Sequence, residues 1–99
     1  MPFKRISIDE AKALIDSGDA TIADVRDADA HRAGNIADSI NIQQENIDDF
    51  LSTADREKPL VVYCYHGHSS QGAADYFPEQ GFADVYIIDG GFVAWSSKY

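Results

Sequence analysis

The sequence predicts a parallel α/β fold in which helices cover both faces of one sheet. Three observations lead to this prediction. Segments rich in β-branched and apolar residues alternate with segments of helical periodicity, residues 60–63 are apolar throughout, as in a central parallel strand, and 99 residues leave room for one domain. Connections in such a sheet are right-handed, and ligands bind at the carboxyl ends of its strands.

The first predicted helix begins after Ser7. Ser7 and Glu10 have the spacing of a capping box, the apolar positions that follow share one helical face, and Gly18 ends the helix. Residues 21–25 have the β-branched and apolar composition of the next strand.

A short helix, a weak strand and a second amphipathic helix follow. Asp27 can cap a helix over residues 28–33, and Gly34 then occupies the C′ position, where a left-handed backbone is usual. Residues 39–42 predict a weak strand. Residues 45–54 predict a helix, because their apolar positions recur every three or four residues.

Two prolines flank the central strand and the helix after it. Pro59 precedes the strand 60–63, and a helix is predicted over residues 72–77. Pro78 should kink that helix or end it early, because proline lacks the N–H that a helix interior needs.

The last strand and helix complete the alternation. Residues 85–88 predict the strand, and residues 92–95 begin the helix. Gly90 and Gly91 give the backbone freedom to turn between them, and Trp95 is expected to anchor the core.

Polar residues follow three of the predicted strands. Asp24 and Arg26 end one, the segment 64–70 follows another, and Asp89 follows the last. Because these ends meet at one edge of a parallel sheet, that edge is the candidate site.

Cys64 is the candidate nucleophile. It is the only cysteine, it ends the central strand, and a loop joins it to a helix amino terminus. Backbone N–H groups and the positive end of the helix dipole favour a thiolate there, and the thiolate is the reactive form of cysteine.

Composition excludes several other classes of function. A net charge of −9 with eight scattered Lys and Arg residues argues against binding to nucleic acid, and an acidic surface repels anionic membranes. No apolar run approaches the roughly 20 residues of a membrane span, and the amino terminus lacks a signal-peptide core. A soluble cytoplasmic protein is expected, without an internal disulfide.

The cysteine loop has three other possible interpretations. Cys64 could be a small buried residue without chemistry. Cys64, His66 and His68 could bind a metal, but a loop with its N–H groups turned inward directs side chains outward, so no metal site is expected. A cysteine-dependent phosphatase would have arginine six residues after the cysteine, where this chain has Ser70, and so lacks the clamp for a phosphoryl group.

The motifs together resemble a rhodanese domain over nearly the whole chain. The resemblance rests on four segments in the family's order, namely Cys64-Tyr65-His66-Gly67-His68-Ser69-Ser70, Asp24-Val25-Arg26-Asp27, Ala33-Gly34-Asn35-Ile36 and Asp89-Gly90-Gly91-Phe92-Val93-Ala94-Trp95. It is strongest toward the family's single-domain bacterial thiosulfate sulfurtransferases. The resemblance implies a five-stranded, mainly parallel rhodanese sheet with helices on both faces, spanning residues 1–99 as one domain.

The chain departs from the family's pattern at two turns. Asn35 stands where the family usually has histidine, and residues 37–39 are Ala-Asp-Ser where it usually has Pro-Gly-Ala. Both are expected to change a turn and not the chemistry. The active loop also contains neither lysine nor arginine.

The resemblance implies a sulfurtransferase that needs no cofactor. Cys64 would take the sulfane sulfur of thiosulfate as a persulfide and pass it to cyanide or to a dithiol such as thioredoxin. The loop residues Tyr65, His66, Gly67, His68, Ser69 and Ser70 would bind the anion, while Asp24 and Arg26 would pair and support the loop. The histidines are expected on the loop surface, and the serines either bond the outer sulfur or cap the helix. The alternative is a rhodanese-like sulfur carrier or protein-binding module without turnover.

Overall fold

The computed structural model describes residues 3–66 and 70–99. Its strands form one sheet in the order β1-β5-β4-β2-β3, and every neighbouring pair is parallel. The strands are β1 (Lys4–Ile6), β2 (Thr21–Asp24), β3 (Ile40–Asn41), β4 (Leu60–Tyr63) and β5 (Val85–Ile88). The helices are α1 (Ile8–Asp16), α2 (Ala28–Ala33), α3 (Ile47–Thr53), α4 (Ser70–Glu79) and α5 (Gly91–Lys98). The predicted parallel α/β fold is confirmed.

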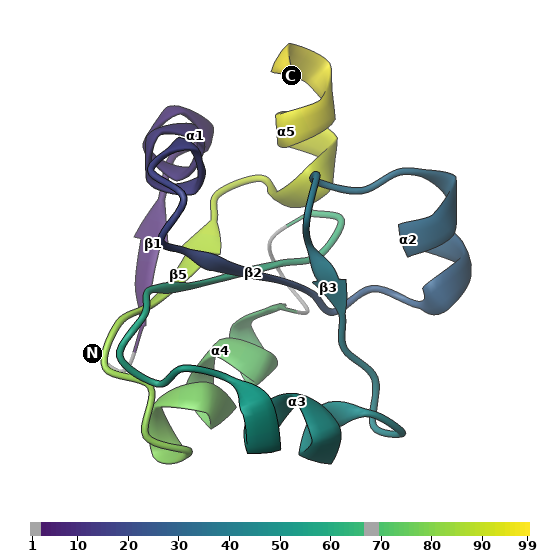
Figure 1. Cartoon of the computed structure of the whole chain (residues 1–99). Helices are drawn as coiled ribbons and strands as arrows, with labels where there is room; N and C mark the ends of the chain where they lie inside the picture. Colours follow the sequence, from purple (N-terminus) through teal and green to yellow (C-terminus); the bar gives the residue numbers. More distant parts are fainter. Residues whose placement is uncertain (1–2, 67–69) are drawn as a thin grey trace.

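The helices divide between the two faces of the sheet (Figure 1). Helices α1 and α5 lie on one face, and α3 and α4 lie on the other. From β1 to β3 the chain moves toward the edge of the sheet that β3 forms, and from β3 to β5 it moves back. Because crossovers between parallel strands are right-handed, the direction in which the chain moves along the sheet decides which face a connecting helix covers. The reversal therefore places α3 and α4 on the face opposite to α1. Strand β4 lies in the middle of the sheet.

Alternation along β4 builds two separate cores. Leu60 and Val62 face α3 and α4, where they pack with Phe50 and Phe77. Val61 and Tyr63 face the other side, in the cluster that contains Trp95. Because all four residues of β4 are buried, the apolar run is explained by helices on both faces. Trp95, 8% exposed, is the core anchor that was predicted.

Local signals placed most of the helix ends correctly. Ser7 accepts a hydrogen bond from the Glu10 N–H, and the Glu10 carboxylate accepts one from the Ser7 N–H, so the capping box is present. Asp27 caps α2 through the Ala30 N–H. Gly18 follows the end of α1 with a φ of 82°.

The conformation predicted for Gly34 needs correction. Gly34 is not left-handed: its φ is −179°, and it continues as extended chain with its carbonyl oxygen 2.6 Å from Arg26 Nη2. The left-handed residue of this region is Asp38, with a φ of 66°. It stands where the family usually has glycine, and aspartate is one of the few other residues that adopt this conformation readily. Helix α4 ends at Glu79, one residue after Pro78, in agreement with the end expected at this proline.

Strand β1 was not expected from the residues themselves. It has three residues, two of them exposed and charged, and pairs with β5 at one edge of the described sheet. Among the described residues, no helix is long and apolar enough to cross a membrane.

Candidate active site

Cys64 lies directly beyond the carboxyl end of the central strand and is 2% exposed. The Val25 N–H donates to the Tyr63 carbonyl oxygen at 3.0 Å, so the pairing of β2 with β4 continues to the residue before the cysteine. The fold therefore places Cys64 between the carboxyl ends of β2 and β5, at the edge of the sheet where the sequence predicted a site.

The first turn of α5 holds the backbone of the cysteine loop. The Phe92 N–H donates to the Cys64 carbonyl oxygen at 2.7 Å, and the Val93 N–H donates to the Tyr65 carbonyl oxygen at 3.0 Å. In a trans peptide the N–H points opposite to the carbonyl. The N–H groups of Tyr65 and His66 consequently point away from α5.

Gly91 is what allows this close approach of helix and loop. Its φ is 61°, and a Cβ atom there would lie 2.6 Å from the Cys64 carbonyl oxygen. The preceding Gly90 has a φ of 78°. The prediction that both glycines serve the turn into the last helix is confirmed, and Gly91 has the further role of admitting the loop.

Asp24 and Arg26 form a buried ion pair with two parallel hydrogen bonds. Arg26 Nε and Nη2 lie 2.9 and 2.7 Å from the two oxygens of Asp24, and the Arg26 N–H adds a third bond of 2.9 Å. Burial alone would raise the pKa of Asp24, but its bonds to Arg26 and His31 outweigh burial and hold that pKa below its usual value of 3.8. The carboxylate and the guanidinium are therefore both charged.

Three aromatic rings enclose the Arg26 guanidinium. Its central carbon lies 4.3 Å from the centre of the Phe92 ring, 5.1 Å from that of Tyr65 and 5.3 Å from that of Tyr63. Tyr65 belongs to the cysteine loop, and Phe92 belongs to the turn that holds it. The buried cation thus connects the end of β2 to the loop through stacked rings.

Several residues of this network were missed by sequence reasoning. His31 Nδ1 lies 2.8 Å from Asp24 Oδ2, and the Tyr63 hydroxyl donates to the same oxygen at 3.1 Å. Asn41 and Gln43 bond the Arg26 carbonyl oxygen at 2.9 and 2.6 Å. These side chains come from four elements or loops, and only the Tyr63 position, at the end of the strand before the cysteine, carried a sequence signal.

The structure gives different results for the other predicted site residues. His66 is exposed, as expected of a loop-surface residue. Gly67, His68 and Ser69 lie outside the described residues, and Ser70 is the first residue of α4. Asp89 is exposed and pairs with Arg5 at 3.5 Å. Within residues 3–66 and 70–99, no three His, Cys, Asp or Glu side chains are grouped so that they could hold a metal ion.

Comparison with known proteins gives a consistent result. The model of the rhodanese-like domain family matches residues 7–98. The thiosulfate sulfurtransferase GlpE of Pseudoalteromonas translucida is 48% identical over 99 residues, which cover 100% of this chain and 94% of that protein. GlpE of Pseudomonas savastanoi pv. phaseolicola is 50% identical over 97 residues, covering 98% and 91%. The crystal structure of a rhodanese-related protein from Thermoplasma volcanium superimposes with a TM-score of 0.82 at 26% identity, covering 97% and 93%.

Proposed function

This chain belongs to the rhodanese-like domain family, and on that premise we propose that it is a thiosulfate sulfurtransferase that works through a persulfide on Cys64. Its relatives of 48% and 50% identity, named thiosulfate sulfurtransferases, extend over almost the whole chain. The proposal assigns the same reaction to this protein.

The proposed reaction has two displacement steps. The Cys64 thiolate attacks the sulfane sulfur of thiosulfate, the sulfur–sulfur bond of thiosulfate breaks, and sulfite leaves with the electron pair. A nucleophilic acceptor then attacks the outer sulfur of the persulfide, and the thiolate of Cys64 is regenerated. With cyanide the product is thiocyanate. With a dithiol such as thioredoxin, the second thiol of the acceptor would release the sulfur as hydrogen sulfide and leave a disulfide.

The observation that carries this proposal is the hydrogen bonding of the loop to α5. Because α5 takes up the carbonyl oxygens of Cys64 and Tyr65, the N–H groups of Tyr65 and His66 face the other way. Fixed N–H groups beside a thiol stabilise its anionic form and then the charged persulfide, without reorganising during the reaction. The amino terminus of α4, a helix of ten residues, adds a positive dipole on the far side of the loop.

We assign the anion-binding role to residues 65–70 of the loop and a supporting role to Asp24 and Arg26. Both charged groups of the pair are buried and satisfy each other, so neither is offered to substrate. Their contact with the loop runs through the Tyr65 ring, which stacks on the guanidinium. The cytoplasm is the proposed location, because the single cysteine cannot form an internal disulfide and is proposed to act as a free thiol, which reducing compartments preserve.

Mass spectrometry tests the covalent step. Thiosulfate should add one sulfur atom, about 32 Da, at Cys64, and cyanide should remove it. The Cys64→Ala variant should take up none. Sulfur transfer to cyanide by the alanine variant would show that the persulfide mechanism is wrong.

Steady-state turnover separates the enzyme from a sulfur carrier. An enzyme should release thiocyanate repeatedly from thiosulfate and cyanide, whereas a carrier or binding module should hold sulfur without repeated turnover. Hydrolysis of an aryl phosphate is not expected, because Ser70 stands where a phosphatase loop needs its arginine.

A further inference from the structure

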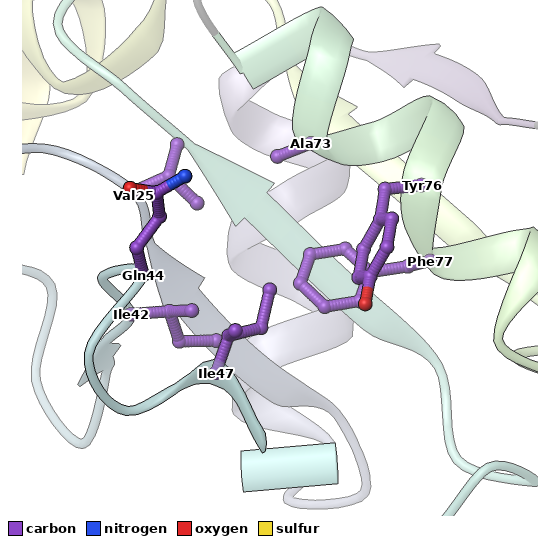
Figure 2. A pocket seen from close by; sticks show the side chains of 7 residues that line it. All are labelled: Val25, Ile42, Gln44, Ile47, Ala73, Tyr76 and Phe77. Carbon is purple, nitrogen blue, oxygen red and sulfur yellow. The ribbon is translucent and has the colours of Figure 1, made fainter. Parts of the chain in front are cut away.

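A cavity of about 350 Å³ opens on the α3–α4 face of the sheet (Figure 2). Helix α4 supplies Ala73, Tyr76 and Phe77 to one wall, and Ile42 and Ile47 face them from the segment around the start of α3. These side chains also pack against the buried core of this face. The cavity is therefore a recess in the core that opens to solvent.

Cys64 lies on the same face as this cavity. Asp24 and Tyr63 are partners in the parallel register of β2 and β4, so the next pair along the strands is Val25 and Cys64. Alternation turns this pair to the side of Ala23 and Val62, which belong to the core beneath α3 and α4. Because Val25 lines the cavity, the lining includes the neighbour of the cysteine in the sheet.

Helix α4 brings a second lining residue close to the cysteine loop. Ala73 is the fourth residue of the helix that follows the loop. Two lining residues therefore lie near the cysteine loop: Val25 directly follows β2, and Ala73 belongs to the start of α4. Both elements therefore lead from the lining of the cavity to the cysteine loop.

Among the residues that the structure describes, none that lines the cavity is charged. Gln44 and the Tyr76 hydroxyl are the polar groups of this described lining, whereas the whole chain carries a net charge of −9. Anionic molecules gain nothing from such walls and are repelled by the protein as a whole. An uncharged apolar group gains free energy by leaving water for them.

We propose that this cavity receives the apolar body of the sulfur acceptor, a small uncharged organic thiol with an aryl or branched alkyl group. The inference rests on the proposed function. The acceptor thiolate attacks the outer sulfur of the Cys64 persulfide, and the bond between that sulfur and Cys64 Sγ breaks. The acceptor becomes a hydropersulfide and Cys64 returns to the thiolate, so the step needs no external oxidant or reductant.

Single-turnover transfer to two thiols tests the inference. The protein is loaded with thiosulfate, freed of excess donor, and mixed with phenylmethanethiol or 2-mercaptoethanol, two uncharged alkanethiols. Loss of the persulfide is followed by mass. We expect phenylmethanethiol to react at least about tenfold faster per thiolate, because an apolar substituent in a fitted pocket gives discrimination of this size.

Two alanine-to-leucine variants test whether the cavity causes the preference for phenylmethanethiol. Ala73→Leu fills part of the cavity and should bring the ratio of the two rates toward one. Ala13→Leu makes the same change on an exposed position of α1 and should keep the wild-type ratio. Phenylmethanol, which lacks the thiol, should slow transfer to phenylmethanethiol in the wild type and leave transfer to 2-mercaptoethanol unchanged.

The outcomes separate this inference from the proposed function. If thiosulfate forms no persulfide, the proposed function is wrong. If the persulfide forms and cyanide removes it, but the two thiols react at equal rates, only the inference is overturned. It is also overturned if phenylmethanethiol is preferred equally in Ala73→Leu and phenylmethanol does not compete.

Discussion

The guanidinium carbon of Arg26 lies 4.3 Å from the centre of the Phe92 ring, so the start of α5 is stacked on the cation that pairs with Asp24. The same turn donates the hydrogen bond from Phe92 to the Cys64 carbonyl oxygen. One residue thus joins the buried ion pair to the backbone of the candidate site. The consequences for stability, acid sensitivity and loop geometry can each be measured.

Replacing Arg26 by methionine should be strongly destabilising. The side chain of Asp24 has no exposed surface, so removal of its partner leaves a buried, partly compensated charge. Breaking a buried pair in this way costs about 3–5 kcal/mol in the free energy of unfolding. Urea denaturation of Arg26→Met measures this loss.

Arg32→Met is the matched control for this substitution. Arg32 pairs with Asp29 at 3.3 Å, but both side chains are largely exposed, and such pairs contribute roughly 0–1 kcal/mol. The double variant Asp24→Asn with Arg26→Met should recover part of the loss, because it removes the unpaired charge. Equal stability of Arg26→Met and Arg32→Met would refute the role given to the buried pair.

Asp24 should make folding stability depend on pH in the acid range. Its folded pKa lies below the usual 3.8, so the unfolded chain binds more protons between the folded pKa and that value. The contribution of Asp24 is present in full above the unfolded pKa and is lost as the pH falls through the folded one. Asp24→Asn should therefore flatten the fall in stability below about pH 4.

A carbon-13 titration of the Asp24 carboxyl group checks this directly in the wild-type protein. Its resonance should still report the ionised form at pH 3.8, where half of an unperturbed aspartate is protonated. A midpoint above that pH would mean that burial outweighs the bonds from Arg26 and His31, and would contradict the prediction.

Gly91→Ala should damage the site as well as the stability. Alanine at a φ of 61° is strained, and its Cβ atom would collide with the loop carbonyls. Because this collision would displace the loop, the rate of persulfide formation should fall. Gly18→Ala is the control, since its φ is 82° but no heavy atom lies within 4 Å of the added Cβ.

The comparison of the two alanine variants separates backbone strain from collision. Gly18→Ala should cost about 1 kcal/mol and keep the rate of persulfide formation. Gly91→Ala should cost more and lose most of that rate. If both variants kept the wild-type rate, the close approach of α5 would not be what shapes the loop.

The alternating strands and helices of the fold were predictable, because the hydrophobic patterns that indicate them lie within short segments of the sequence. The segments β2, β4 and β5 and the capping box at Ser7 each carry their signal within a few residues. Strand β1 carries none: it is short, polar and stabilised by pairing with β5, more than eighty positions away in the chain. The fifth strand was expected only from the resemblance to the rhodanese family.

The site was predictable at its centre and not at its periphery. The cysteine and the Asp24–Arg26 pair stand at strand ends, which the sheet brings together. His31 and Gln43 reach the same network from α2 and from the chain after β3, and nothing in their local sequence indicates this. The left-handed conformation predicted for Gly34 is wrong. Its carbonyl oxygen accepts a hydrogen bond from Arg26, and the statistics of helix ends do not include such a contact.

The charge distribution leads to a prediction about salt. Thiosulfate is a dianion, and the protein carries a net charge of −9, so long-range forces oppose its approach. Arg26 offers no compensation, because its guanidinium is buried and paired with Asp24. The attraction that remains comes from backbone N–H groups of the loop at short range.

Added chloride should therefore leave the rate of persulfide formation unchanged or raise it. The Debye length falls to about 10 Å at 0.1 M salt, which screens the distant repulsion but not contacts inside the loop. The second-order rate is measured in sodium chloride from roughly 0.01 to 0.3 M at constant pH and low thiosulfate. Sulfate is left out, because it could occupy the same N–H groups. A steep fall with salt would show instead that a cation near Cys64 dominates the local field and attracts the substrate.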